Sequence, residues 1–226
     1  MKVIAFKGLI GSGKSTVAKA FTWLLYNDIK HMSDFVVTKL LDNDITVQDV
    51  IDDDLLNDAK YDRFATPMKH FFASLLGVNV QTLNNQEFKT QTFTDIFGDK
   101  SLRQMHLDLS DWLKLHCNNP DVFADSMKRR ILSYDADKTA YIVIDDLRYT
   151  EEHAMLQQLV LENVIDDYVC IECKRTDCSI SNETQKSKHS SETEQLKIVA
   201  DYLYMNSMNL IQDCKQLVPI IKRIIC

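Results

Sequence analysis

The sequence predicts an α/β fold, in which a mainly parallel sheet is covered by helices on both faces to give a three-layer sandwich. Three observations support this prediction. Apolar segments of strand length alternate along the chain with amphipathic segments of helix length. A glycine-rich turn joins the first of these strands to the first helix. A continuous apolar run at residues 141–144 is followed by two acids, which is typical of a central parallel strand buried on both faces.

The strands of this sheet can be placed from their apolar runs. We expect them at residues 3–6, 61–65, 141–144, 168–173 and 202–205. Helices are expected after the glycine-rich turn, from Pro67 to the glycine at 77, near 102–113, from Asp121 onward, at 151–161 and from about 208 to 225.

Three further features along the chain are also predicted. The helix that Pro67 opens is expected to bury one face, formed by Met68, Phe71, Phe72, Leu75 and Leu76. Residues 78–100 are polar and fit loop and short helix better than core. Residues 28–58 carry many aspartates, and we interpret them as a solvated acidic insertion because they lack the spacing of an EF-hand.

Length and charge limit the function classes. With 226 residues, the chain is expected to form one domain over 1–226, with the acidic insertion at about 28–58 and a lid-like loop at about 175–194. The net charge of −7 argues against binding to a nucleic-acid polymer, so a small-molecule substrate is expected. The apolar runs are too short to span a membrane, and Met1 leads directly into the first strand rather than into a signal peptide. We therefore expect a cytoplasmic protein.

Cysteine usage suggests a reducing compartment. The six cysteines are scattered and are expected to be free thiols. Cys170, Cys173 and Cys178 could form a zinc site with His189 in the lid-like loop. However, Cys170 and Cys173 lie on an expected strand, where residues i and i+3 face opposite sides. This arrangement disfavours a zinc site.

The glycine-rich turn matches the phosphate-binding P-loop, Gly-x-x-x-x-Gly-Lys-Ser/Thr, at every required position. It reads Gly8-Leu9-Ile10-Gly11-Ser12-Gly13-Lys14-Ser15. In this motif the glycines allow successive backbone N–H groups to point at phosphate oxygens, and the next helix contributes its positive dipole end. Lys14 would reach the terminal phosphates, and the Ser15 hydroxyl would complete a Mg²⁺ shell. The chain is therefore expected to bind a nucleoside triphosphate.

Three further motifs extend the prediction from the triphosphate to its acceptor. They are Phe64-Ala65-Thr66-Pro67-Met68-Lys69, Asp146-Leu147-Arg148-Tyr149-Thr150-Glu151-Glu152 and His189-Ser190-Ser191-Glu192. In this order and at these separations the motifs resemble the phage-type deoxynucleoside monophosphate kinases, whose pattern includes Asp-x-Arg-x-x-x-Glu at a strand end and a later His-x-Ser/Thr-Glu. The resemblance implies a P-loop kinase-like fold with a small lid, Mg²⁺ as cofactor with ATP as co-substrate, and a homodimer.

The physical requirements of such a reaction agree with this resemblance. A monophosphate acceptor brings about two negative charges toward an anionic triphosphate, so fixed cations must neutralise and align the two substrates. Lys14 and Arg148 are the expected catalytic cations, and Asp146 is the third catalytic residue, orienting the sugar or base of the acceptor. Arg148 could instead form a structural pair with Glu152. Asp145 is the expected acid beside Ser15 for Mg²⁺, although the division of roles between Asp145 and Asp146 stays open.

The resemblance also implies the residues that bind each substrate. The residues expected to bind ATP are Gly11, Ser12, Gly13, Lys14, Ser15, Thr16 and Arg175. The residues expected to bind the acceptor are Ile10, Lys69, Arg103, Ser110, Asp111, Phe123, Asp146, Arg148 and Glu152. The chain has Leu109-Ser110-Asp111 where the family usually has Gly-Thr, which leaves base recognition open. Phe123 would stack on the base, or it is a core aromatic residue of an amphipathic helix.

The predicted activity is the ATP-dependent phosphorylation of deoxynucleoside 5′-monophosphates to diphosphates for DNA precursor synthesis, in the host cytoplasm if the protein is phage-encoded. A dephospho-coenzyme A kinase is the first alternative, because its P-loop often has nearly the same sequence. Another small-molecule P-loop kinase is a second alternative. A nucleotide-dependent switch or ATPase subunit is less favoured, since the chain lacks the Asn-Lys-x-Asp motif by which GTPases recognise their base.

Overall fold

The computed structural model describes residues 1–26, 59–175, 193–207 and 210–225. The predicted acidic insertion and most of the predicted lid-like loop lie outside these ranges, as do Cys178 and the motif that begins at His189. The described residues form two compact units, which we name the sheet unit (Met1–Arg63 with Lys128–Cys226) and the helical unit (Phe64–Met127). The assignment of 1–226 to one domain remains a prediction.

The sheet unit contains a five-stranded, fully parallel sheet, as the sequence predicts. The strands are β1 (Lys2–Lys7), β2 (Ala59–Asp62), β3 (Tyr141–Ile144), β4 (Asp167–Arg175) and β5 (Tyr202–Asn206). Their order across the sheet is β2-β3-β1-β4-β5. The first strand is thus central, and Val3 pairs with Ile142 on one side and with Tyr168 on the other.

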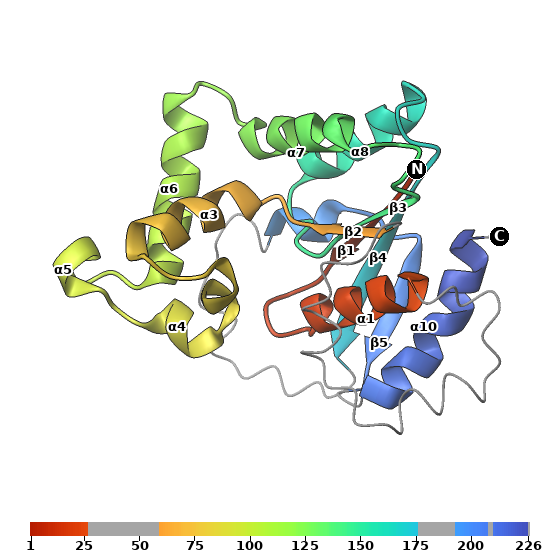
Figure 1. Cartoon of the computed structure of the whole chain (residues 1–226), viewed down its shortest axis with the longest axis horizontal. Helices are drawn as coiled ribbons and strands as arrows, with labels where there is room; N and C mark the ends of the chain where they lie inside the picture. Colours follow the sequence, from red (N-terminus) through yellow and green to blue (C-terminus); the bar gives the residue numbers. More distant parts are fainter. Residues whose placement is uncertain (27–58, 176–192, 208–209, 226) are drawn as a thin grey trace. The chain divides into compact units, whose positions relative to one another are not determined.

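Helices cover both faces of this sheet, which confirms the three-layer prediction (Figure 1). Helices α1 (Lys14–Tyr26) and α10 (Leu210–Ile225) lie side by side on one face, where Ile4 and Phe6 join their apolar core. Helix α8 (Thr150–Leu161) lies on the other face. Its residue His153 is hydrogen bonded through Nδ1 to the hydroxyl of Tyr168 at 2.8 Å. Because side chains alternate along a strand, β1 contributes to both cores.

The second strand ends earlier than the expected range of 61–65. Strand β2 stops at Asp62, and the next residues form a turn that leads into the helix at Thr66. Pairing with β3 ends at Asp62, and the next backbone N–H, that of Arg63, donates to the Asp62 side chain at 2.6 Å instead of to a neighbouring strand. The apolar pair Phe64 and Ala65 therefore belongs to the turn rather than to the sheet.

The helical unit has its own apolar core. Its elements are α3 (Thr66–Leu76), the 3₁₀ helix η1 (Val80–Asn84), α4 (Gln86–Thr90), α5 (Thr94–Phe97) and α6 (Leu102–His116), while α7 (Val122–Ser133) crosses the boundary between the units. The fully enclosed residues of this core are Phe72, Ala73, Leu83 and Leu102. Residues 78–100 form loops and short helices, as predicted. They nevertheless contribute to a core, which the prediction did not expect, because Leu83 is buried and Phe88, Phe93 and Phe97 pack against the same cluster.

The buried face of α3 also differs from the expected one. Phe72 is buried, whereas Phe71 and Leu75 are 52% and 48% exposed. The five apolar residues cover a wide arc of the helix, and only the part centred on Phe72 and Ala73 faces the core. Gly77 ends the helix in a left-handed conformation, as its position predicts. Within the described ranges, the helices are too short or too polar to cross a membrane.

Candidate functional site

The site is built where the chain changes direction across the sheet. Strands β1 and β3 are neighbours, but the loop after β1 leads to α1 on one face, and the loop after β3 leads to α8 on the other. In open parallel sheets, ligands bind at the carboxyl ends of two such strands, where the following loops separate. The sequence motifs after β1 and β3 therefore meet at the position that this topology favours for a ligand.

The first loop has the conformation of a phosphate-binding turn. Gly13 has φ +79°, and a Cβ atom at this position would lie 1.9 Å from the side-chain nitrogen of Asn206. At Gly8 a Cβ would lie 2.5 Å from the carbonyl oxygen of Cys173. The loop closes through a hydrogen bond of 3.1 Å from the Ser12 N–H to the Leu9 carbonyl. The glycines are thus required both by conformation and by close neighbours.

Two hydrogen bonds that the sequence patterns do not predict hold this loop in place. At the end of β5, the buried Asn206 amide nitrogen donates to the Ser12 carbonyl at 2.8 Å. Near the 3₁₀ helix η2 (Gln195–Lys197), the buried Gln195 side-chain oxygen accepts from the Gly8 N–H at 3.2 Å. Lys7 supports this turn from β1 by donating to the Ile198 carbonyl at 2.6 Å. In the sequence, the polar Asn206 directly follows the apolar run at 202–205, and this position is a signal for the first hydrogen bond.

The predicted ATP-binding residues surround this loop. The Ser12 hydroxyl oxygen is buried and has no hydrogen-bond partner among the described atoms. The Lys14 ammonium group folds back toward the Leu9 carbonyl at 3.5 Å. Arg175, at the end of β4, donates to the Gly11 carbonyl at 3.4 Å, so a residue far along the chain reaches the loop. Ile10 and Ser15 are half-buried, while Thr16 is exposed in the first turn of α1.

The strongest ion pair of the site joins Asp145 to Arg63. Nε of Arg63 donates to one carboxylate oxygen at 2.5 Å, and Nη2 donates to the other at 2.7 Å. The Asp145 side chain is 1% exposed, and the hydroxyl groups of Ser15 and Tyr61 lie near it. Burial by itself would raise the pKa of Asp145, but the charge and hydrogen bonds of Arg63 and the two hydroxyl groups hold it below its ordinary value. Arg63 was not among the predicted site residues.

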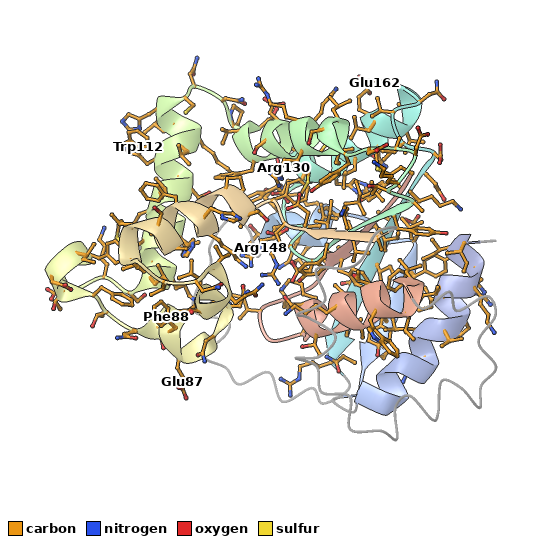
Figure 2. All side chains as sticks on the ribbon, viewed as in Figure 1. Glu87, Phe88, Trp112, Arg130, Arg148 and Glu162 are labelled. Carbon is orange, nitrogen blue, oxygen red and sulfur yellow. The ribbon has the colours of Figure 1, made fainter. Side chains whose placement is uncertain are left out.

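The acid and arginine that follow Asp145 lie on the same loop. Figure 2 shows the Arg148 side chain near the ends of the central strands. The buried Glu152 carboxylate accepts hydrogen bonds from the backbone N–H of Arg148 at 2.8 Å and of Tyr149 at 3.1 Å. Burial and the nearby charge of Asp146 raise the pKa of Glu152 to about 8. Glu152 thus fixes the backbone from which Arg148 projects.

The other predicted acceptor residues belong to the helical unit. Lys69 on α3 donates to the side-chain oxygen of Asn84 at 2.7 Å. On α6, Arg103 is half-buried, Ser110 is buried and Asp111 is exposed. Phe123 is only 8% exposed on α7, which agrees with the interpretation of this residue as a core aromatic. All of these residues lie within Phe64–Met127, the helical unit.

The oxygen donors near the loop suit a hard cation in part. The Ser15 hydroxyl can offer lone pairs to Mg²⁺, and Asp145 lies beside it. However, both carboxylate oxygens of Asp145 are already bonded to Arg63. In the described ranges there is no cluster of three or more histidine, cysteine, aspartate or glutamate side chains that could hold a metal ion. Cys170 and Cys173 are buried cysteines that are not joined in a disulfide, and they lie on opposite faces of β4.

No protein-family profile matches the chain, and no curated protein sequence matches it. Among solved structures, a cysteine-to-alanine mutant of the Mycobacterium tuberculosis APS kinase CysC is 12% identical over 98% of this chain and 96% of its own, with a TM-score of 0.36. The same kinase in complex with AMPPNP and APS is 12% identical over 98% of this chain and 97% of its own, with a TM-score of 0.38.

Proposed function

We propose that this protein transfers the γ-phosphoryl group of ATP, together with Mg²⁺, to a deoxynucleoside 5′-monophosphate. The observation that carries the proposal is the topology of the sheet: the Gly8–Ser15 motif after β1 and the acids and arginine after β3 follow neighbouring parallel strands whose loops lead to helices on opposite faces. A phosphate-binding motif and an acidic and basic strand end therefore lie together at the position where parallel sheets bind ligands. Phosphoryl transfer needs these two parts, a cradle for the donor and fixed charges for the acceptor.

On the donor side, the loop and α1 supply the groups that a triphosphate requires. Backbone N–H groups of Gly11, Ser12 and Gly13 and the dipole of α1 would bind phosphate oxygens. The buried Ser12 hydroxyl supports this assignment because a phosphate oxygen would give it a partner. Lys14 would leave the Leu9 carbonyl for the terminal phosphates, a stronger charge-assisted contact. Thr16 and Arg175 would extend the binding site at its rim.

Mg²⁺ would be held by the Ser15 hydroxyl, with an acid of the loop after β3 acting through water. The chemistry that Mg²⁺ would supply there is neutralisation of the negative charge that develops during transfer. The residues of the chain itself align the substrates and exclude water, and no covalent intermediate on the protein is needed. Asp145 and Asp146 both remain candidates for the acid.

On the acceptor side, Arg148 is the principal candidate. Its guanidinium can form a bidentate pair with the acceptor phosphate, while Asp146 orients the sugar or base. Glu152 contributes by holding the Arg148 backbone. The remaining candidates for acceptor contacts are Ile10, Lys69, Arg103, Ser110, Asp111 and Phe123. Of the last group, Lys69 and Arg103 carry the positive charge that would suit a dianionic acceptor.

The proposal is tested by measuring ADP release in a coupled assay with dGMP, dTMP, dCMP, dAMP and dephospho-coenzyme A as separate acceptors. We expect at least one deoxynucleoside monophosphate to accelerate ADP formation above the basal rate, with a matching diphosphate product. Acceleration by dephospho-coenzyme A alone would favour the first alternative kinase. No acceleration by any acceptor, with basal hydrolysis retained, would overturn the proposal and favour a switch or ATPase subunit.

A further inference from the structure

A short segment ahead of β5, residues 194–198, contacts both loops of the candidate site, and we name it the bridging segment. The buried side-chain oxygen of Gln195 accepts a hydrogen bond of 3.2 Å from the Gly8 N–H, at the start of the loop after β1. The carboxylate of the preceding residue, Glu194, accepts a hydrogen bond of 3.2 Å from the hydroxyl of Thr150. Thr150 is the first residue of α8, the helix that follows the loop after β3. Two successive residues therefore hold the loop after β1 and the start of α8.

The bridging segment is also fixed to β1 by a buried lysine. The Lys7 ammonium group donates to the carbonyl oxygens of Gln195 at 3.2 Å and of Ile198 at 2.6 Å. The carboxylate of Glu172, on the neighbouring strand β4, lies 3.9 Å from the same ammonium nitrogen. A buried ammonium group is tolerated only when such partners replace its lost water. Lys7 and the next residue along the chain thus both contact Gln195, so the strand that carries the phosphate-binding loop also positions Gln195.

The Gly8 N–H is the point at which the bridging segment acts on the phosphate-binding loop. A buried N–H group needs an acceptor, and the side chain of Gln195 supplies one. Gly8 is closely packed, since a Cβ at this position would lie 2.5 Å from the Cys173 carbonyl oxygen and 2.7 Å from the Ser12 hydroxyl oxygen. A displacement of Gly8 would therefore be transmitted to Ser12, whose backbone N–H is one of those that would bind phosphate.

We infer that the bridging segment makes the affinity for nucleotide depend on the start of α8. Gln195 positions the phosphate-binding loop and Glu194 holds the first turn of α8, so a change at Thr150 reaches Gly8 through two adjacent residues. Both are positioning residues, because they act through the loop and the helix that they hold. The inference rests on the proposed function only in that the loop from Gly8 to Ser15 binds a nucleotide.

Calorimetry with AMPPNP and Mg²⁺ tests the contact between Gln195 and Gly8, because it measures Kd without turnover. Gln195→Met keeps the length of the side chain and removes the acceptor, so we expect Kd to rise by about tenfold. Gln195→Glu keeps an oxygen acceptor, and the ammonium group of Lys7 lies close enough to balance the added charge. Kd should then rise by less than about threefold. Unchanged Kd in Gln195→Met would overturn the inference.

Thr150 tests whether the effect crosses from α8 to the loop. Among the described residues, its hydroxyl is hydrogen bonded to Glu151 and Glu194 and not to the loop from Gly8 to Ser15. Thr150→Val removes the hydroxyl and keeps the branched shape, and we expect Kd for AMPPNP to rise by about threefold. In the Gln195→Met background the same change should add almost nothing, since the connection is already broken. Additive rises in Kd, or no rise in Thr150→Val, would overturn the inference.

A second pair of variants does not depend on the buried Gln195 and so keeps the inference testable if Gln195→Met does not fold. Glu194→Met breaks the contact with Thr150 from the other end, at a side chain that is 25% exposed. Kd should rise by about threefold in Glu194→Met, and adding Thr150→Val should cause no further rise. Unchanged Kd in Glu194→Met, or a larger rise in the double variant, would contradict the connection.

Asp201→Ala is the matched control. Asp201 lies between the bridging segment and β5, and its carboxylate accepts a hydrogen bond of 2.8 Å from the Cys170 N–H. We expect this variant to lower the melting temperature and to leave Kd for AMPPNP unchanged. An equal rise in Kd in Asp201→Ala and Gln195→Met would show a general loosening of this region and would overturn the inference. If AMPPNP affinity depends on Gln195 and Thr150 but no monophosphate is phosphorylated, the inference stands and only the proposed function is rejected.

Discussion

The side chain of Asn206 occupies the space that any side chain at Gly13 would need. Its amide nitrogen donates to the Ser12 carbonyl at 2.8 Å and lies 1.9 Å from the position of a Cβ on Gly13. The last strand of the sheet therefore supports the loop after the first strand, although 194 positions separate Asn206 from Ser12. This contact holds the backbone of the loop at Ser12 and leaves no space for a side chain at Gly13.

The first prediction concerns this glycine. Gly13→Ala should weaken AMPPNP binding by about 10- to 100-fold, because an alanine at φ +79° costs about 1–3 kcal/mol in addition to the clash. Calorimetry measures the loss. Adding Asn206→Ala removes the clash but not the backbone strain, so we expect only partial recovery. Gly77→Ala is the control: Gly77 also has a positive φ, at the end of α3, and its replacement should lower stability without changing nucleotide affinity.

The second prediction separates the donor half of the site from the acceptor half. Arg148→Ala should reduce kcat for the best monophosphate by about 10²- to 10³-fold, the usual effect of removing one group that stabilises transition-state charge. Its affinity for AMPPNP should remain close to that of the unmodified protein. Lys14→Ala should instead weaken AMPPNP binding. Equal loss of AMPPNP binding in both variants would reject the assignment of Arg148 to the acceptor.

Local sequence patterns identify the parts of the candidate site that lie within one segment. The loop from Gly8 to Ser15 follows a motif with fixed spacing, and Asp145 and Asp146 directly follow an apolar run. Arg63 and Gln195 were missed because their roles depend on partners 82 and 187 positions away. Neither has a neighbouring residue that signals the contact. Such pairs arise only when the strand order brings distant strand ends together.

The same limit explains the errors within the fold. On α3, helical periodicity predicted that Phe71 and Leu75 would be buried, but both are exposed. Periodicity shows which residues share an apolar face of the helix, but it does not show which part of that face packs against the core. Similarly, the many polar residues of 78–100 concealed Leu83, whose burial depends on α3 and α6. Propensity and pattern therefore identified the elements better than their packing.

The third prediction concerns the buried Glu152 and the change in the free energy of unfolding between pH 4.5 and pH 8. The pKa of this carboxyl is raised from 4.5 to about 8, so between these values the folded chain holds a proton that the unfolded chain has released. The free energy of unfolding must then fall as the pH rises from about 4.5 to 8. Glu152→Gln cannot ionise, and its side-chain oxygen can still accept the N–H groups of Arg148 and Tyr149.

Urea denaturation at pH 5 and pH 8 tests this prediction. We expect Glu152→Gln to lose less stability than the unmodified protein between the two pH values, by more than about 1 kcal/mol. Glu151→Gln is the control, because Glu151 is an exposed neighbour on the same helical turn. Its pH dependence should match that of the unmodified protein. A Glu152→Gln variant with the same pH dependence would show that the carboxyl does not hold its proton.

The fourth prediction concerns His106 and stability in acid. This residue of α6 packs its ring 4.4 Å from that of Phe72, and Nδ1 is hydrogen bonded to the Leu102 carbonyl at 2.9 Å. The other ring nitrogen, Nε2, is buried and has no hydrogen-bond partner among the described atoms. A proton on Nε2 would thus place a charge in an apolar core. Burial, with a smaller contribution from Lys69 and Lys89, lowers the pKa of His106 from 6.5 to about 4.

Between pH 6.5 and pH 4 the unfolded chain therefore binds a proton that the folded chain does not, so the free energy of unfolding falls as the pH falls through this range. A pKa difference of this size corresponds to about 3 kcal/mol. In His106→Gln, the free energy of unfolding should depend less on pH than in the unmodified protein, as measured by urea denaturation at pH 7 and pH 4.5. His116→Gln, at an exposed site on the same helix, should retain it. If His106→Gln loses as much stability as the unmodified protein between pH 7 and pH 4.5, the prediction is wrong. The acid sensitivity then belongs to other groups, because glutamine at position 106 cannot take up a proton in this range.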